Sequence, residues 1–285
     1  MTGDVRLLQR LGYVFRDPER LVQALTHRSH GAHNNERLEF LGDGVVNLVM
    51  ADALYARFPD LAEGDVAELQ WPYLRKNAPH IWRRDLRGVR NPYIGVLSLD
   101  EATLLYNNAL PFKAKRGLEI GCHYAWSTAH LVAAGLDLDV IDPALGQPDQ
   151  MRDVRDSLSK IGAARLWAGF SPSVVPAVRA FLPAPWSFAF IDGWHEGDGP
   201  RDDARAVLPL MADDALVMFH DLVSPHVAAG LAVFADAGWQ VGLYNTMQVM
   251  GVAWRGATAP APHVADRDMP EAEGAFLTRF AKISC

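Results

Sequence analysis

Two residues about 20 positions apart, Gly121 and Asp142, have the types and spacing of a nucleoside-binding site. Gly121 follows the apolar residues 118–120 and lets the backbone turn sharply close to a ligand. Ser127 or Thr128 can then cap a helix whose free N–H groups face that ligand. Asp142 ends the next apolar stretch, where a carboxylate can accept hydrogen bonds from ribose hydroxyls. The sequence therefore predicts a strand–helix–strand unit with a nucleoside pocket at one end.

The turn after Gly121 lacks the full Gly-x-Gly-x-x-Gly pattern of dinucleotide sites. Tyr124 and Trp126 occupy positions where a pyrophosphate group would need glycine. A nucleoside ligand without phosphates therefore fits this turn better.

Polar side chains also follow two later apolar stretches. Asp192 and His195 come after the first stretch, and His220 and Asp221 come after the second. The carboxyl ends of parallel strands meet at one edge of a sheet, so these side chains are expected to converge with Gly121. An imidazole titrates near neutral pH, so His195 or His220 could remove a proton from a nucleophile.

A third group of polar residues lies near the amino terminus. Glu36, Glu39 and Asp43 fall on one face of a predicted helix, 34–58, that is apolar around nearly its whole circumference. Carboxylates inside a buried helix are costly unless they bind a cation, and hard oxygen ligands suit Mg²⁺.

The residues around Gly121 resemble motif I of class I S-adenosylmethionine-dependent methyltransferases, with Glu119, Gly121 and Asp142 at its defining positions. Phe-Ile-Asp-Gly-x-His at 190–195 and Phe-His-Asp at 219–221 are similar to small-molecule O-methyltransferases, including enzymes that act on sugars of natural products. The resemblance implies S-adenosylmethionine as cofactor, with Asp142 on its ribose and residues 169–171 along its adenine. The implied cofactor-binding residues are Glu119, Gly121, Ser127, Asp142, Gly169, Ser171 and Asp192.

The same resemblance bears on the catalytic residues. Some relatives hold Mg²⁺ with an aspartate after the fourth strand and an acid–aspartate pair after the fifth. Asp192, His220 and Asp221 occupy those positions here, but His220 departs from the all-carboxylate pattern and is a poorer ligand for Mg²⁺. The catalytic residues are predicted to be His195, Asp192 and His220, with either Mg²⁺ or an imidazole activating the acceptor.

Three stretches near the amino terminus resemble the catalytic domain of ribonuclease III: Ala-Leu-Thr-His-Arg-Ser (24–29), Asn-Asn-Glu-Arg-Leu-Glu-Phe-Leu-Gly-Asp (34–43) and Glu-Gly-Asp (63–65). Glu39 and Asp43 match the first two metal ligands of that family, and Glu36 and Glu63 match supporting acids. The resemblance stops near Gln70, and the Asp-x-x-Glu pair that completes the metal site has no counterpart. Hydrolysis by metal-bound water needs the complete ligand set, so an inactive fragment is the main interpretation.

Alternating strand and helix patterns predict an α/β fold, a doubly wound Rossmann-like methyltransferase sheet whose last strand can run antiparallel, with an all-α amino-terminal fragment. The predicted strands are 118–120, 138–141, 164–167, 187–191, 215–219, 239–244 and 248–254. The predicted helices are 18–25, 34–58, 98–110, 127–134, 149–161, 174–182, 201–211, 225–237 and 271–283.

Four domains or segments follow from these patterns. Residues 1–70 form the incomplete ribonuclease III-like fragment and 71–94 a basic lead-in. Residues 95–256 form the methyltransferase domain, and 257–285 a proline-rich linker followed by a helix.

The charge distribution bears on partners. The 285 residues carry a net charge of -7, but residues 71–116 hold 9 basic and 3 acidic side chains. RNA binding through residues 1–90 is therefore an alternative, whereas the chain as a whole is not built to coat nucleic acid. The buried helix exposes apolar surface without its partner helices, so it must pack on the second domain, pair with another copy in a homodimer, or stay partly molten. No leader pattern and no apolar run near ~18 residues is found, so a cytoplasmic protein without membrane contact is predicted.

The predicted function is S-adenosylmethionine-dependent methylation, most simply of an oxygen on a small molecule or sugar. The alternatives are an RNA-directed protein that methylates or cleaves double-stranded RNA with Mg²⁺, a nuclease rebuilt by dimerisation, and a module that binds the cofactor without turnover.

Overall fold

The computed structural model describes residues 16–26, 33–35, 37–38, 41–42, 45, 82–84, 90–92, 97–159, 161–265 and 271–283. The chain divides into two compact units, Met1–Gln70 (unit 1) and Trp71–Cys285 (unit 2).

In unit 1, helix α2 (Pro18–Leu25) begins where the sequence predicts it. The Asp17 side chain accepts a hydrogen bond from the Glu19 N–H, and Pro18 occupies the first turn. Of the predicted helix 34–58, residues 34 and 35 form a bend, so the helix begins later than predicted, and the other described residues, 37, 38, 41, 42 and 45, are helical. The predicted metal ligands Glu39 and Asp43 lie outside the described residues.

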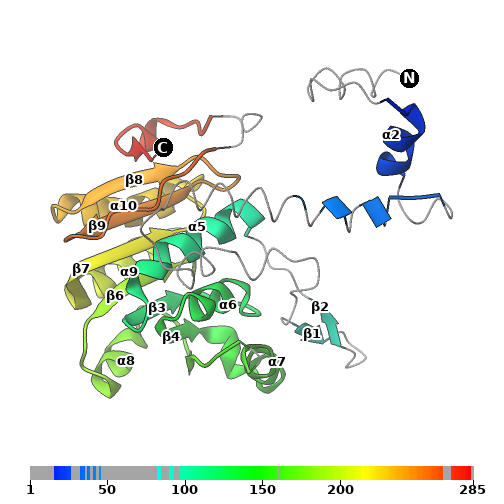
Figure 1. The fold of residues 1–285 in the computed structure, drawn as a ribbon. Coiled ribbons are helices and arrows are strands. Elements are labelled where there is room, and N and C mark those ends of the chain that lie inside the picture. The colour runs from blue at the N-terminus through cyan, green and yellow to red at the C-terminus, as the bar shows by residue number, and fades with distance from the viewer. Residues whose placement is uncertain are drawn as a thin grey trace. The chain divides into compact units, whose positions relative to one another are not determined.

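Unit 2 contains an eight-stranded sheet in the order β10-β8-β9-β7-β6-β3-β4-β5 among the described residues (Figure 1). Five adjacent strands run parallel to one another: β3 (Arg116–Ile120), β4 (Asp137–Asp142), β5 (Arg165–Ala168), β6 (Trp186–Ile191) and β7 (Met211–Phe219). Strand β9 (Met250–Arg255) is antiparallel to both β7 and β8 (Gln240–Tyr244). The predicted doubly wound sheet with a late antiparallel strand is therefore confirmed.

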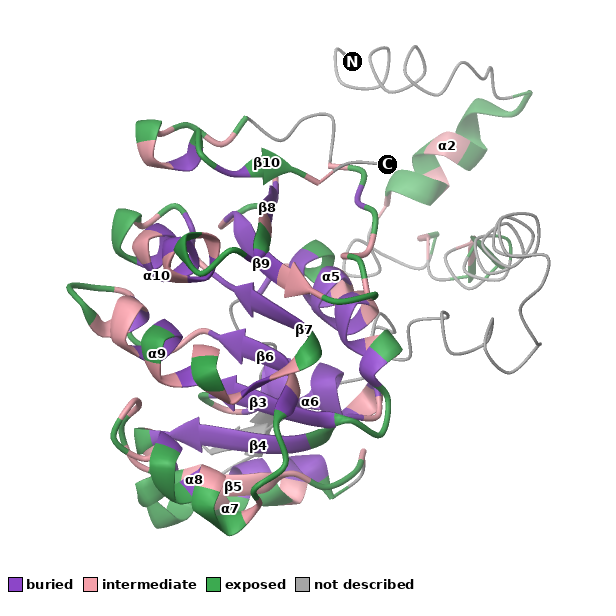
Figure 2. Ribbon diagram, turned by 90° about the vertical axis from the view of Figure 1, so that its left-hand side faces the viewer, coloured by how far each residue is buried: buried purple, intermediate pink, exposed green. Residues whose placement is uncertain are grey.

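Helices cover both faces of this sheet. Helices α5 (Leu99–Ala109), α6 (Trp126–Ala133) and α7 (Pro148–Leu158) contribute to one core cluster. Helices α8 (Val175–Phe181), α9 (Gly199–Val207) and α10 (Pro225–Asp236) contribute to the other. Successive side chains of a strand point to opposite faces, so Phe188 and Phe190 join the first cluster while Ala189 and Ile191 join the second. The central strands β3, β4, β6 and β7 are correspondingly buried along most of their length (Figure 2).

The predicted helix 201–211 is shorter than expected. Helix α9 ends at Val207, a 3-10 turn η4 spans Leu208–Leu210, and Met211 already begins β7. Pro209 has no N–H to donate, which disfavours continuing the α-helix at this point.

The predicted carboxy-terminal helix 271–283 is wrong. The segment forms a 3-10 turn, η5 (Ala275–Leu277), and then strand β10 (Ala281–Lys282), which pairs in parallel with β8. The N–H of Ile283 donates to the Leu243 carbonyl, and the absence of a side chain at Gly242 leaves room for the Ile283 side chain. The pairing provides hydrogen-bond partners for backbone groups on the open edge of β8, which a separate helix would leave unpaired. This stabilisation by a distant segment outweighs the local helical pattern of the sequence.

Within the predicted basic lead-in, β1 (Trp82–Arg84) and β2 (Arg90–Pro92) form an antiparallel two-stranded ribbon. Two further short turns, η2 (Leu110–Phe112) and η3 (Pro143–Gly146), precede β3 and follow β4. In the described part of the chain, every helix falls short of the length and apolar character that a bilayer crossing requires.

Candidate functional site

A cavity of about 340 Å³ opens at the carboxyl ends of β3, β4, β5 and β6. Its wall includes seven of the residues predicted from the sequence: Gly121, Ser127, Asp142, Ser171, Asp192, His195 and Asp221. Glu119, Gly169 and His220 are described but do not line it. The fold therefore brings most of the predicted methyltransferase site together.

The Asp142 carboxylate holds the turn that contains Gly121. Its Oδ2 atom accepts hydrogen bonds from the backbone N–H groups of Cys122 and His123, both at 2.8 Å. Its Oδ1 atom accepts from the Ala144 N–H at 2.7 Å. Asp142 therefore points toward the turn and lines the cavity, but it also anchors the backbone, a role that the sequence did not indicate.

Gly121 is required by the backbone opposite it. Its φ is +87°, and a Cβ atom built on it would overlap the carbonyl oxygen of Asp192 at the end of β6. The turn thus needs glycine because two strand ends approach closely, which also narrows this side of the cavity.

Ser127 does not cap α6 as the sequence predicted. The residue before the helix is Ala125, in the left-handed conformation with φ 71° and no side-chain cap. Ser127 lies in the first turn and donates its hydroxyl to Glu119 Oε1 at 2.5 Å. Burial raises the pKa of Glu119 to about 8, against the opposing effect of the Ser127 hydrogen bond. Glu119 therefore carries a proton at neutral pH. It does not line the cavity itself, but it holds Ser127, which does.

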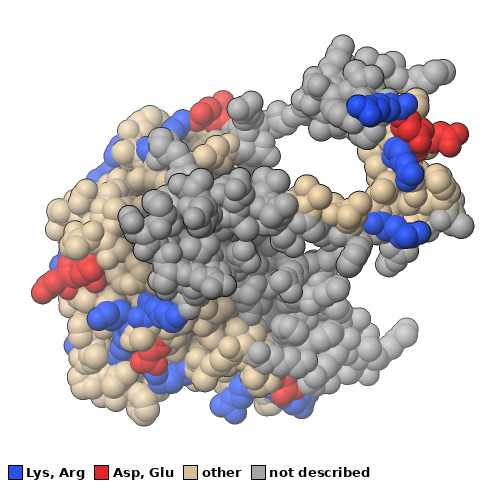
Figure 3. Space-filling model, in the orientation of Figure 1, with Lys and Arg blue, Asp and Glu red and all other residues tan. Residues whose placement is uncertain are grey.

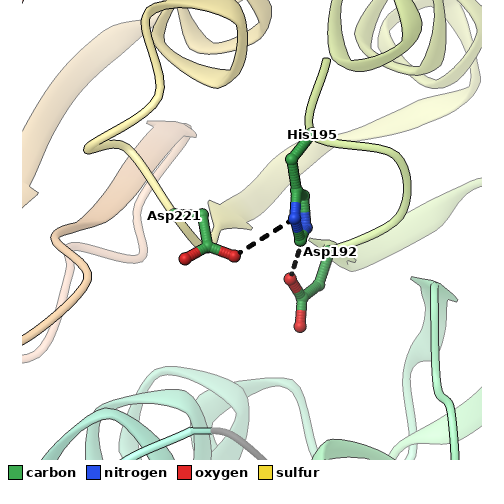
Figure 4. A group of neighbouring side chains, drawn as sticks. All are labelled: Asp192, His195 and Asp221. Carbon is green, nitrogen blue, oxygen red and sulfur yellow. Dashed lines mark hydrogen bonds and ion pairs between the residues drawn. The ribbon is translucent and has the colours of Figure 1, made fainter.

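A cluster of Asp192, His195 and Asp221 lies at the cavity (Figure 4). His195 Nε2 is 3.1 Å from Asp192 Oδ1, and His195 Nδ1 is 3.4 Å from Asp221 Oδ2. The Asp192 hydrogen bond raises the pKa of His195, although burial acts in the opposite direction. The imidazole is held between two carboxylates while its side chain stays 41% exposed.

His220 lies behind this cluster and is buried. Its Nδ1 atom is 3.4 Å from Asp192 Oδ1 and 3.2 Å from Asp221 Oδ2, and its Nε2 atom is 3.5 Å from Glu101 Oε2. Burial disfavours the charged imidazole, but the three carboxylates outweigh it and raise the pKa of His220 to about 12. His220 is therefore a buried cation that holds the two aspartates together.

Sequence reasoning missed the place of Glu101 in this cluster. Glu101 was visible as an acid in the first turn of α5, where it completes a capping box with Ser98. Its other oxygen accepts a hydrogen bond from the Gln248 N–H at 2.8 Å. Burial raises the pKa of Glu101, but hydrogen bonds from His220 and two backbone N–H groups bring it down to about 2. Only the packing of α5 on the sheet reveals this contact.

The predicted Mg²⁺ does not suit the residues present. Ligand atoms of Asp192, His195 and Asp221 lie within 4.8 Å of one another, so distance alone would admit a metal ion. Asp192 Oδ1 and Asp221 Oδ2, however, are the same oxygens that face the His220 cation. Mg²⁺ also favours an all-oxygen ligand set, which His195 and His220 do not offer.

Family models match both parts of the chain. Residues 118–222 match a model described as a methyltransferase domain, and residues 17–78 match a model described as ribonuclease-III-like. The carboxy-terminal part thus resembles class I S-adenosylmethionine-dependent methyltransferases, and the first 70 or so residues resemble part of ribonuclease III.

The curated relatives match the amino-terminal part. Ribonuclease 3 of Thiobacillus denitrificans is 58% identical over 73 residues, which cover 26% of this chain and 32% of the relative. Ribonuclease 3 of Cupriavidus taiwanensis is 56% identical over 72 residues, which cover 25% of this chain and 28% of the relative. The chain therefore spans about a third of the length of the curated relatives it matches.

Solved structures similar to this chain include an O-methyltransferase from Bacillus cereus in complex with SAH, at 14% identity and a TM-score of 0.46. That match covers 57% of this chain and 84% of the other. The O-methyltransferase TomG from Streptomyces achromogenes matches at 18% identity and a TM-score of 0.46, covering 57% of this chain and 82% of the other. These sequence identities and TM-scores are too low to assign the fold. The assignment therefore rests on the strand order and on the match to the family model.

Proposed function

We propose that residues 95–256 form a methyltransferase domain that transfers a methyl group from S-adenosylmethionine to a hydroxyl group of a small molecule. One observation carries the proposal: a single cavity is bounded both by the Gly121 turn, held by Asp142, and by the cluster of Asp192, His195 and Asp221. The first set of residues suits a nucleoside and the second suits removal of a proton. The match to the methyltransferase family model supports the same conclusion.

Methyl transfer is an in-line displacement in which the sulfonium already activates the leaving group. The protein has to hold the acceptor oxygen close to the methyl carbon and take its proton. His195 fits this role because it lines the cavity and is held by Asp192 and Asp221. His220 fits a positioning role, since its raised pKa of about 12 leaves it protonated at neutral pH.

The charge of the domain supports a small acceptor. Residues 117–285 carry 11 basic and 20 acidic side chains. On the face shown in Figure 3, the described Lys and Arg side chains are interspersed with Asp and Glu. A polyanionic acceptor such as RNA would be repelled by this excess of acidic groups. Methylation of a sugar hydroxyl remains a finer prediction within the same proposal.

Calorimetry with the full chain and S-adenosylmethionine tests the cofactor, and transfer of a labelled methyl group to a panel of phenols, catechols and sugars tests the reaction. His195→Gln should lower kcat about a hundredfold or more with cofactor binding retained, because glutamine cannot accept the proton. In the parent protein kcat/KM should rise with pH through the raised pKa of His195, because only the neutral imidazole accepts a proton.

The matched control is His226→Gln, which changes an exposed histidine of α10 away from the cavity and should leave the rate unchanged. Failure of the full chain to bind S-adenosylmethionine would refute the proposal. Equal rates in the two histidine variants would refute the role of His195.

We propose cleavage of double-stranded RNA as a second candidate, confined to unit 1. The observation that favours it is the 58% identity to a ribonuclease 3 over 73 residues. Glu39 and Asp43 match the first two metal ligands of that family, but the chain spans only about a third of that relative. The test is cleavage of double-stranded RNA with and without Mg²⁺, compared between the parent chain and Asp43→Asn. Cleavage that depends on Mg²⁺ and is lost in the variant supports this candidate, and its absence removes it.

A further inference from the structure

Residues 257–263, which we call the strap, run from the end of β9 to helix α5. Asp214 on β7 accepts hydrogen bonds from the backbone N–H groups of Ala257 and Thr258, both at 2.9 Å. At the other end of the strap His263 is only 7% exposed, and the ring of Tyr244 on β8 packs edge-on against it, with ring centroids 5.7 Å apart. This part of the predicted linker is therefore held on the domain at both of its ends.

The strap contacts α5 near both ends of that helix. His263 Nε2 lies 3.0 Å from Asp100 Oδ2, in the first turn of α5. The Ala261 N–H donates to Asn108 Oδ1 at 2.9 Å, one residue before α5 ends. The two contacted residues are about 12 Å apart along the helix axis, at 1.5 Å per residue. Contacts that far apart fix α5 both along its axis and in its rotation about that axis.

Apolar packing alone would not fix α5 in this way. The buried apolar residues of α5 belong to one of the two core clusters of the domain. Hydrophobic burial is non-directional, so it tolerates small shifts of a helix across a sheet. Hydrogen bonds are directional and weaken when the helix moves. The strap therefore helps to determine which residues of α5 meet the strand ends.

The exact position of α5 matters because Glu101 directly follows Asp100. Glu101 is fully buried, and its Oε1 atom accepts a hydrogen bond from the Gln248 N–H at 2.8 Å. Its Oε2 atom lies 3.5 Å from His220 Nε2. A buried carboxylate is costly unless it is paired, so a shift of α5 that broke these contacts would be unfavourable.

The backbone beside the two contacts of Glu101 is strained. Asp221 has a φ of 61° and Val249 a φ of 54°, and each directly follows one of the two residues that Glu101 contacts. Left-handed conformations are uncommon for residues other than glycine, and they persist where the surrounding structure holds them. Asp221 in turn lies 3.4 Å from His195, measured from Oδ2 to Nδ1. Glu101 is thus placed to hold the backbone that carries Asp221.

We propose that the strap is a positioning element for methyl transfer. By fixing α5 it holds the Glu101 carboxylate at His220, and this contact keeps Asp221 in place at the cavity. Glu101 and His263 are positioning residues, because neither of them lines the cavity. The inference rests on the proposed function, and it adds a segment that lies beyond the end of the matched methyltransferase model.

A double-mutant cycle in the full chain tests the proposal, with the phenol, catechol or sugar that the parent protein methylates fastest as acceptor. His263→Ala and Glu101→Gln should each lower kcat about tenfold, because small displacements of the groups at the reacting centre slow a reaction strongly. The acceptor KM and the binding of S-adenosylmethionine in calorimetry should not change, since neither residue lines the cavity. The double variant should be no slower than Glu101→Gln alone, because the contact that the strap supports is already lost.

The matched control is His226→Ala, the same change at an exposed histidine of α10, which should leave kcat unchanged. Hydrogen–deuterium exchange adds a measurement that needs no turnover. The Gln248 N–H should exchange faster in His263→Ala than in the parent protein, because it donates to Glu101. This measurement also decides the question if Glu101→Gln does not fold.

Four results would overturn the inference and leave the proposed function intact. They are a parent-like kcat in His263→Ala, additive effects in the double variant, unchanged exchange at Gln248, and a loss of S-adenosylmethionine binding that parallels the loss of kcat. The last would mean that the strap supports the domain as a whole. Absence of methyl transfer by the parent protein would instead refute the proposed function, and the inference with it.

Discussion

The carboxylate of Asp142 should stabilise unit 2 as well as contact a ligand. It accepts three backbone hydrogen bonds, from Cys122, His123 and Ala144, at 2.7–2.8 Å. Asp142→Ala removes all three acceptors. A buried donor left unpaired costs about 1–3 kcal/mol, and water can reach the His123 and Ala144 groups more easily than that of Cys122. The expected loss in the free energy of unfolding is therefore about 3–5 kcal/mol.

For a unit of this size a loss of 3–5 kcal/mol lowers Tm by on the order of 10 °C. Scanning calorimetry of the full chain measures it. Asp142→Asn keeps one oxygen acceptor in the same place, so its loss should be about half as large. Asp149→Ala is the control, because Asp149 lies exposed on α7 and pairs with an exposed Arg152. That change should cost less than about 0.5 kcal/mol.

A Tm for Asp142→Ala within about 2 °C of the parent protein would refute the anchoring role. The same comparison separates two effects on cofactor binding. Asp142→Ala is expected to weaken binding both by loosening the turn and by removing the predicted ribose contact, whereas Asp142→Asn keeps more of the turn. The ribose contact is therefore better tested with asparagine at the working temperature.

Three further predictions concern two residues at or behind the cavity wall and one ion pair within the sheet. Gly121→Ala should cost at least about 2 kcal/mol in urea denaturation and weaken cofactor binding, because the residue has a positive φ and its Cβ would overlap Asp192; parent-like stability would contradict this. Glu119→Gln should change how stability varies with pH. The folded pKa of about 8 exceeds the ordinary pKa of a glutamate, 4.5, so the parent's stability is full below pH 4.5 and is lost as pH rises through 8. Denaturation at pH 5 and pH 9 should show the variant gaining up to about 4 kcal/mol on the parent at the higher pH, and a constant difference would argue against a buried proton. Asp139→Ala should cost about 3–5 kcal/mol by urea denaturation, because it leaves the buried Arg116, at 2.8 Å, without its counter-ion; a loss under 1 kcal/mol would show that the pair is dispensable.

The sequence predicted the sheet well because the patterns that indicate its strands and helices involve residues close together in the chain. Apolar runs such as that of β6 end at polar residues, and the capping box at Ser98 marks the start of α5. The positions of Gly121, Asp142 and Asp192 at strand ends followed directly from the pattern. Parallel strands then bring these ends to one edge whatever the details of the loops.

The errors arise where contacts distant in sequence decide the outcome. The start of α6 depends on the left-handed conformation of Ala125, which no neighbouring residue type signals. Whether the residues at the cavity suit Mg²⁺ or a proton acceptor depends on the charge of His220. That charge depends on Glu101, which lies on α5, far away in the sequence. Asp203 reads as an ordinary acid in a polar helix until its burial beside Ser171 is known. Such contacts need the tertiary structure.

The short strand β10 has a consequence for assembly. An outer strand with free N–H and C=O groups is the usual point at which two sheets join edge to edge. Here residues 281 and 282 of the same chain already lie along β8. Two copies could join their sheets through β8 only after β10 had dissociated from it, so a homodimer, one of the outcomes that the sequence leaves open, should use a different surface.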